Sequence, residues 1–201
     1  AIWISHFHLD HFGGLAPFLF GTKYAPETQK RKKPLKIFGA SGLEEILTKY
    51  DEAYSFGFLN QPFPLEIVEV EALEKFQVLE DLEAVAFDTP HTTESRAIQL
   101  KDDRGKLLVF TSDTGFTKDL AVFADRSDLF VIECSFVKDK PVESHIELAE
   151  AIHLARSSKA KKVMLTHLYP EWDTVDFDEE VEKYLPGCPI IEARDGLRIE
   201  I

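Results

Sequence analysis

The chain has 201 residues, of which 44% are hydrophobic and 29% charged, as in an ordinary globular protein with a sizeable core. Its formal net charge of −13 argues against a nucleic-acid partner that is bound by neutralising many phosphates, although a small phosphate-containing molecule remains compatible with it. No apolar run approaches the length of a membrane span. Cys134 and Cys188 follow no metal or redox spacing, so we expect reduced thiols and a cytoplasmic location. The length of the chain predicts one domain over residues 1–201.

A histidine-rich segment near the start of the chain is its most distinctive feature. Residues 5–11 read SHFHLDH and contain three of the seven histidines, directly after the apolar, strand-like residues 1–4. His6 and His8 are two apart at a strand end and therefore face the same side, whereas Asp10 and His11 follow in the turn. Neutral imidazole and carboxylate are common metal ligands, so this spacing predicts two adjacent ions rather than a merely polar turn.

The first third of the chain alternates strands with helices. A helix is expected from residue 15, with Pro17 in its first turn, and a solvated basic loop follows at residues 22–34. A strand at 35–38 precedes a second helix, whose predicted capping box pairs Ser41 with Glu44. Residues 55–64 form an aromatic connection, which we interpret as packing under a loop, with the lining of a substrate cleft as the alternative.

The rest of the chain reads as a meander of strands followed by alternating helices and strands, which favours a layered α/β fold. Strands are predicted at residues 65–70, 76–79, 84–87, 97–100, 107–110, 129–132, 161–165, 190–192 and 197–201. Helices are predicted at residues 118–124, 144–158 and 178–184, the second with a capping box between Ser144 and Glu147.

More candidate ligands follow the ends of these strands. His91 lies in the loop TPHTTES, Asp113 in TSDTG after an apolar strand, and His167 directly after the strand at 161–165. His145 lies in the first turn of the predicted long helix, and His153, further along that helix, reads as a surface or packing residue.

The pattern His-x-His-x-Asp-His after a strand, followed by Gly13-Gly14 and an apolar helix, resembles the metallo-β-lactamase fold superfamily. Within it, the chain is most similar to the ribonuclease Z-like phosphodiesterases, over nearly all of its length. The resemblance implies an α/β fold of the four-layer αββα sandwich type. It also leads us to expect further strands before Ala1 that complete the first sheet, and it suggests a homodimer.

The resemblance further implies a site with two divalent metal ions and a bridging hydroxide, with zinc as the first expectation and manganese or iron as alternatives. One ion would be held by His6, His8 and His91, and the other by Asp10, His11 and His167, with Asp113 between them. Asp10 would also orient the nucleophile. His145 corresponds to the family's proton donor to the leaving oxygen, although the residues after it are larger here than is usual in the family.

The spacing between two candidate ligands bears on the substrate. Transfer-RNA-processing members usually carry a long arm between the positions of His91 and Asp113, and here Asp113 comes only 22 positions after His91. We therefore expect a hydrolase of a small or cyclic phosphodiester. The alternatives are hydrolysis of an aryl sulfate, lactone or thioester, and, less favoured, an RNA-processing nuclease or a non-catalytic metal-binding protein.

Overall fold

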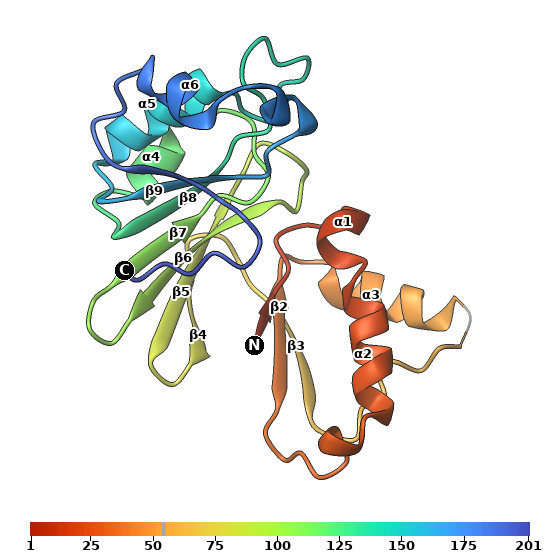
Figure 1. Ribbon diagram of the computed structural model, residues 1–201. Helices are drawn as coiled ribbons and strands as arrows, with labels where there is room; N and C mark the ends of the chain where they lie inside the picture. The colour runs from red at the N-terminus through yellow and green to blue at the C-terminus, as the bar shows by residue number, and fades with distance from the viewer. Residues whose placement is uncertain (54) are drawn as a thin grey trace.

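The computed structural model describes residues 1–53 and 55–201, and its strands form two sheets (Figure 1). The smaller sheet is parallel and has the order β1 (Ile2–Trp3), β2 (Leu35–Gly39), β3 (Leu65–Glu69). The short β1 ends directly before the histidine-rich segment, so this sheet places the first candidate ligands.

The larger sheet has seven strands in the order β10-β9-β8-β7-β6-β5-β4. Strands β4 to β7 form an antiparallel meander, whereas β7 to β10 run parallel to one another. Their bounds are β4 (Lys75–Leu79), β5 (Leu82–Asp88), β6 (Arg96–Asp102), β7 (Leu107–Phe110), β8 (Leu129–Glu133), β9 (Val163–Thr166) and β10 (Ile190–Glu192).

Helices cover the outer side of each sheet (Figure 1). The smaller sheet carries α1 (Leu9–Phe12), α2 (Leu15–Tyr24) and α3 (Leu43–Glu52), and the larger sheet carries α4 (Asp119–Phe123), α5 (Leu148–Ser158) and α6 (Phe177–Glu182). Two 3₁₀ turns, Pro26–Thr28 and Pro170–Thr174, complete the set of helical segments. The expected αββα layering is confirmed. Among the described residues, no helix combines the length and apolar character that crossing a bilayer requires.

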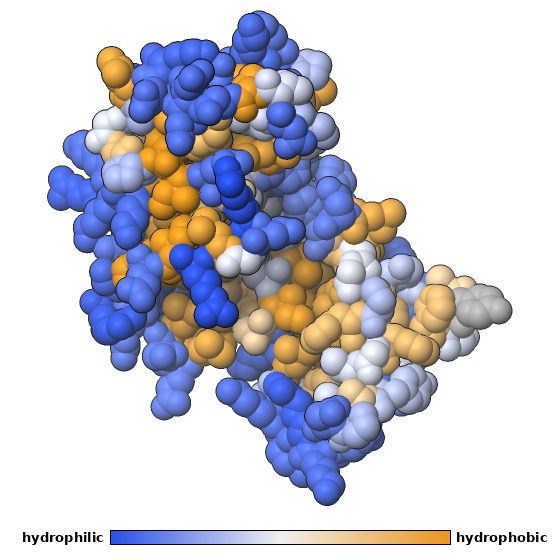
Figure 2. Space-filling model, viewed as in Figure 1, coloured by the Kyte–Doolittle hydropathy of each residue, from blue (hydrophilic) through white to orange (hydrophobic). Residues whose placement is uncertain are grey.

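Three apolar clusters hold these layers together. Phe130 and Ile132 of β8 pack under α5, and Ile37 of β2 packs under α2 and α3. Between the sheets, Trp3 stacks on Phe76 with ring centroids 6.1 Å apart. Apolar residues also gather in the hollow between the two sheets, where a groove of about 530 Å³ is lined by residues of both (Figure 2).

Both predicted capping boxes are wrong, and the second error changes the setting of His145. The N-cap of α3 is Gly42 at φ 94°, and its end is capped by the carboxylate of Glu69, which accepts the N–H groups of Gly42 and Glu44. Helix α5 begins at Leu148, with the capping box between Glu147 and Glu150. His145 therefore lies in the loop before the helix and not in its first turn.

The chain after β10 also departs from the prediction, because residues 197–201 form no strand. Gly196, at φ 82°, turns the chain after β10. The N–H of Leu197 donates to the carbonyl of Arg194, and Lys162 Nζ donates to the carbonyl of Glu200, but no strand ladder forms among these described residues. The other predicted strands and helices are present; β7 and β10 have the predicted bounds, and the rest have shifted ends.

The topology brings several loops to one edge of the larger sheet. Because β5 and β7 both run antiparallel to β6, and β7, β8 and β9 are parallel, four strands end at the same edge. Gly115 keeps two of the loops there in contact, since a Cβ at this position would lie 2.2 Å from the carbonyl oxygen of Glu143 and 2.9 Å from that of Pro90. The loops that carry His91 and His145 are therefore packed against the segment after Asp113.

Candidate metal centre

The seven residues predicted as ligands meet at this edge, where the first sheet approaches the second. Side-chain atoms of three sets each lie within 4.8 Å of one another: His6, His8, His91; His6, His11, Asp113; and Asp10, His11, His167. Their positions follow from the strand ends, since β1 delivers the first histidines and β5, β7 and β9 deliver His91, Asp113 and His167.

The first set presents three ring nitrogens to a common point. Nδ1 of His8 lies 3.1 Å from Nε2 of His6 and 3.1 Å from Nε2 of His91. Nδ1 of His91 donates to the backbone carbonyl of Ser144 over 2.8 Å, which leaves its Nε2 as a lone-pair donor. Bonds of 2.0–2.1 Å in a tetrahedral zinc site would put neighbouring nitrogens about 3.3 Å apart. The observed spacing therefore fits a shared ion.

The set of Asp10, His11 and His167 contains a carboxylate, and Asp113 lies between this set and the set of His6, His8 and His91. Nε2 of His11 is 3.4 Å from Oδ2 of Asp10 and 3.2 Å from Oδ2 of Asp113. The same Asp113 oxygen lies 3.3 Å from Nε2 of His167, 3.8 Å from that of His91 and 3.9 Å from that of His6. A single buried carboxylate thus faces ligands from both sets, which is the position that a bridging ligand needs.

The electrostatics suit cation binding. Burial is the largest of the effects that lower the pKa of His6 to about 4, so its imidazole is neutral at neutral pH. Burial raises the pKa of Asp113, but the hydrogen bond from His11 and the nearby imidazoles outweigh it, and the pKa lies below its usual value. The hydrogen bond with Asp113 raises the pKa of His11. A neutral imidazole and an ionised carboxylate are the forms that bind a metal.

Two residues of the site adopt a left-handed backbone conformation. Ser112, directly before Asp113, has φ 54°, and His167 has φ 57°. For residues other than glycine this conformation costs about 1 kcal/mol or more, and such residues concentrate at functional sites. In both cases the chain turns abruptly after a buried strand. The turn at Ser112 directs the side chain of Asp113 toward the centre, and the turn at His167 directs its own side chain there.

These donors fit a divalent metal pair. The imidazole-rich set favours zinc, and the carboxylates of Asp10 and Asp113 also suit manganese or iron. The side chain of Asp10 is 73% exposed, so the centre is open to solvent on that side. An open side is a property of catalytic rather than closed structural metal sites.

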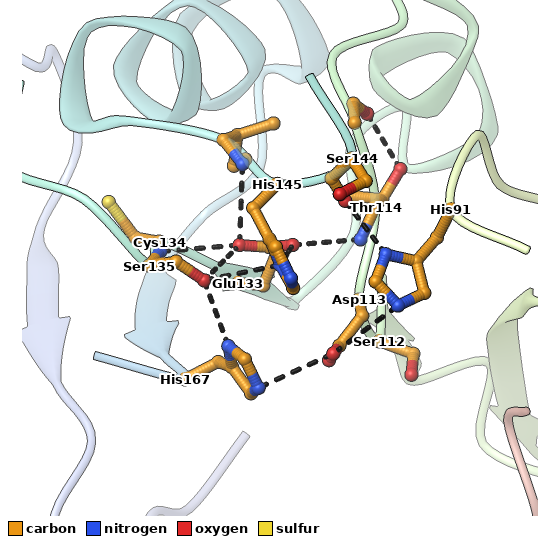
Figure 3. Close-up of polar contacts among 12 residues, drawn as sticks. His91, Ser112, Asp113, Thr114, Glu133, Cys134, Ser135, Ser144, His145 and His167 are labelled. Atoms are coloured by element: carbon orange, nitrogen blue, oxygen red, sulfur yellow. Dashed lines mark hydrogen bonds and ion pairs between the residues drawn. The ribbon is translucent and has the colours of Figure 1, made fainter. Parts of the chain in front are cut away.

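His145 lies beside the centre and is held by a buried acid (Figure 3). Its ring stacks on that of His167 with centroids 5.3 Å apart, and its Nδ1 donates to Oε1 of Glu133 over 2.8 Å. Burial lowers the pKa of His145, but the hydrogen bond and charge of Glu133 and the charge of Asp113 outweigh it and raise the pKa. The carboxylate of Glu133 thus favours the protonated form of the His145 imidazole.

Sequence reasoning missed Glu133, the last residue of β8. Its side chain is fully buried and also accepts the N–H groups of Thr114 and Ser135 over 2.8 and 3.2 Å. A signal was present, because Glu133 is an acid at the end of an apolar strand, as Asp113 nearly is. It also missed Tyr169, whose ring lies 5.3 Å from that of His167 and 5.7 Å from that of His145.

The model of the "Beta-lactamase superfamily domain" matches residues 1–168 of this chain. The chain belongs to the β-lactamase superfamily. As a superfamily member it shows the metallo-β-lactamase fold, with the histidine-rich segment after β1 and the remaining candidate ligands at strand ends of the second sheet. The resemblance drawn from the sequence motif is thereby confirmed.

Individual members of the superfamily resemble the whole chain. Ribonuclease Z from Pyrococcus horikoshii is 25% identical over 251 aligned positions that cover all of this chain and 78% of the relative. Among solved structures, the metallo-β-lactamase fold protein YhfI from Bacillus subtilis has a TM-score of 0.75 at 18% identity, with 97% of this chain and 75% of that one covered. Zinc-bound PqqB from Methylobacterium extorquens has a TM-score of 0.77 at 13% identity, with 99% and 72% covered.

Proposed function

We propose that this protein is a metal-dependent phosphodiesterase that cleaves a small or cyclic phosphodiester with a dinuclear metal site. One ion would be held by His6, His8 and His91, and the other by Asp10, His11 and His167, with Asp113 shared between them. When bound, the ions would supply Lewis acidity, lowering the pKa of a water and neutralising charge at the attacked phosphorus. Zinc is the proposed ion, with manganese or iron as alternatives.

The protein's own groups would handle the protons. Asp10, whose carboxylate is exposed at the open side, would orient the attacking water and accept its hydrogen bond. His145 would give a proton to the leaving oxygen from Nε2, since Nδ1 is already engaged with Glu133. The Tyr169 ring beside His145 would exclude water from one side of the leaving group.

The single observation that carries the proposal is the pairing of His145 with buried Glu133 next to the ligand cluster. An alkoxide leaving group needs a proton, so a protonated imidazole held at the centre favours diester cleavage with a poor leaving group. An aryl sulfatase would have the same need for metals but less need for this acid, because a phenolate is a weaker base than an alkoxide; a lactone, which releases an alkoxide, would also use it. These other esters remain the alternative, because one fold supports many reactions.

A direct test is turnover of bis(p-nitrophenyl) phosphate by the zinc- or manganese-loaded protein, compared with an aryl sulfate and a panel of lactones and thioesters. We expect the phosphodiester to be the preferred substrate. Absence of phosphodiester turnover with two ions bound per chain would overturn the proposal, and preference for another ester would support the alternative.

An RNA substrate is the second candidate, because the relative from Pyrococcus horikoshii is named a ribonuclease Z. Two observations favour the smaller substrate. The segment from His91 to Asp113 contains only β6, β7 and a tight turn, and the alignment to that relative is longer than this chain of 201 residues, so the relative has insertions that are lacking here. Cleavage of a precursor transfer RNA, with a 2′,3′-cyclic nucleotide as the competing substrate, decides between the two.

A further inference from the structure

Ser135, two residues after Glu133, lies among a buried carboxylate and two histidines (Figure 3). Its Oγ is 2.9 Å from Oε2 of Glu133, 2.9 Å from Nδ1 of His167 and 3.3 Å from Nδ1 of His145. The residue is fully buried. A hydroxyl carries one hydrogen, so Ser135 can donate to only one of these neighbours and must accept from, or merely touch, the others.

The direction of each hydrogen bond follows from what each group carries. The ionised carboxylate of Glu133 only accepts, and the Nδ1 hydrogen of His145 already goes to Oε1. Oε2 is therefore the acceptor for the Ser135 hydroxyl, and the hydroxyl oxygen accepts the Nδ1 hydrogen of His167. That tautomer leaves Nε2 of His167 as the lone-pair nitrogen, and Nε2 is the atom that lies 3.3 Å from Oδ2 of Asp113.

The opposite tautomer is disfavoured by the same contacts. If His167 carried its hydrogen on Nε2, its Nδ1 would require the hydrogen of Ser135. Oε2 of Glu133 would keep the N–H groups of Ser135 and Ile146 as donors but would lose the hydroxyl hydrogen. It would then face the lone pairs of the hydroxyl oxygen at 2.9 Å, which is unfavourable in a buried site.

We propose that Ser135 is a positioning residue that transmits the orienting effect of Glu133 to His167, so that one buried carboxylate orients both the acid His145 and a metal ligand. The inference rests on the proposed metal ligand set. It means that the tautomer of His167, and with it the affinity for the second ion, depends on a glutamate that does not touch the metal.

The backbone around Ser135 is held independently of its hydroxyl. The N–H of Tyr169 donates to the carbonyl of Ser135 over 3.1 Å, and the N–H of Cys134 donates to the carbonyl of Thr166 over 2.8 Å. Removing the hydroxyl therefore leaves the β8 and β9 ends in place, and the effect of Ser135→Ala can be assigned to the lost hydrogen bonds. Ser158 is a matched control, because it is equally buried and its hydroxyl donates to the carbonyl of Ala155 and accepts the N–H of Ala160, away from the site.

The test is the affinity of each variant for zinc, measured without substrate by competition with a chromophoric chelator. We expect Ser135→Ala to weaken binding of the second ion about 10- to 100-fold, the usual effect of removing an outer partner of a ligating histidine. Ser135→Thr, which keeps the hydroxyl, should restore most of the affinity, and Ser158→Ala should leave it unchanged.

A double-mutant cycle with Glu133→Gln tests transmission. We expect Glu133→Gln to weaken metal binding in the wild-type background and to have little further effect in the Ser135→Ala background, because the path is already broken. Wild-type affinity in Ser135→Ala, or an equal effect of Glu133→Gln in both backgrounds, would overturn the inference while leaving the proposed function standing.

Two further measurements keep these results interpretable. Circular dichroism melts of the metal-free variants show whether each is folded. If Ser135→Ala unfolds, Ser135→Cys replaces it, because cysteine is close to serine in size but forms weaker hydrogen bonds. Ser135→Cys should also bind the second ion more weakly than the wild type does. A wild-type protein that binds fewer than two ions would overturn the proposed metal site, and this inference with it.

Discussion

Glu133 and His145 are 12 residues apart in the chain, and their side chains form a 2.8 Å hydrogen bond in a buried site. The bond fixes which imidazole nitrogen carries the hydrogen toward Glu133 and which one faces the ligand cluster. The position of His145 matters as well. A histidine in the first turn of a helix would be disfavoured as a cation, whereas His145 precedes α5 and faces a carboxylate.

Substituting His145 should lower turnover in a manner that depends on the leaving group. We expect His145→Ala to reduce kcat about 10²- to 10⁴-fold for an alkyl or nucleoside leaving group, since general acid catalysis contributes on that scale. The loss should be much smaller for bis(p-nitrophenyl) phosphate, because p-nitrophenolate leaves without a proton. Steady-state kinetics on both substrates measure the difference, and His153→Ala, at an exposed position of α5, is the control. Equal losses on both substrates would argue against an acid role.

Substituting Glu133 should act on the pH profile. Glu133 raises the pKa of His145, so the protonated acid persists to higher pH in the wild type. Glu133→Gln removes that effect, and the fall of kcat on the alkaline side should move to lower pH, with a loss of about 10- to 100-fold at neutral pH. An unchanged alkaline limb, with only a uniform loss of rate, would instead indicate a purely structural role. Glu180→Gln on α6 is a control outside the site.

Removing the shared carboxylate should reduce metal binding. The wild type is expected to hold two ions per chain, and Asp113→Asn to hold fewer, because Oδ2 of Asp113 lies within 3.9 Å of histidines from both sets. Metal analysis after gel filtration measures the ratio. The activity of Asp113→Asn should be at least about 100-fold below that of the wild type. The wild-type activity should be lost on dialysis against a chelator and return with zinc. Full metal content in Asp113→Asn would contradict the bridging role, and Asp119→Asn on α4 is the control.

Asp128 should make the stability depend on acid pH. The hydrogen bond from Lys161 is the first cause that lowers its pKa from 3.8 to about 2. Since the folded-state pKa is below the unfolded value, the stabilisation is full above pH 4 and is lost as the pH falls toward 2.

Asp128→Asn should therefore lower the free energy of unfolding by about 1 to 2 kcal/mol at pH 7, after allowance for solvent screening of the exposed lysine. Near pH 2 the difference from wild type should vanish. Urea unfolding at both pH values checks this, and a difference that stays constant with pH would contradict it. Asp173→Asn, at an exposed position, should show no comparable effect.

The candidate ligands were accessible from the sequence because each follows an apolar strand, and strand-forming runs are a local property. The spacing of His6, His8 and Asp10 alone predicts metal ligands, whereas His91, Asp113 and His167 were added by resemblance to a family. The strand ends were off by at most two residues, since packing against neighbours decides where a strand stops.

Local sequence determined the alternation of strands and helices and the ligands of the histidine-rich segment, and the resemblance of its motif to a family gave the αββα layering and the remaining ligands. Only the tertiary structure decided which of them meet and in which protonation state. The capping of α3 depended on Glu69 from another strand, and the roles of Glu133 and Ser135 depended on hydrogen bonds to His145, in a loop at least 10 residues away. Such partners lie far apart in the chain, and burial, which makes their hydrogen bonds strong, exists only once both sheets have formed.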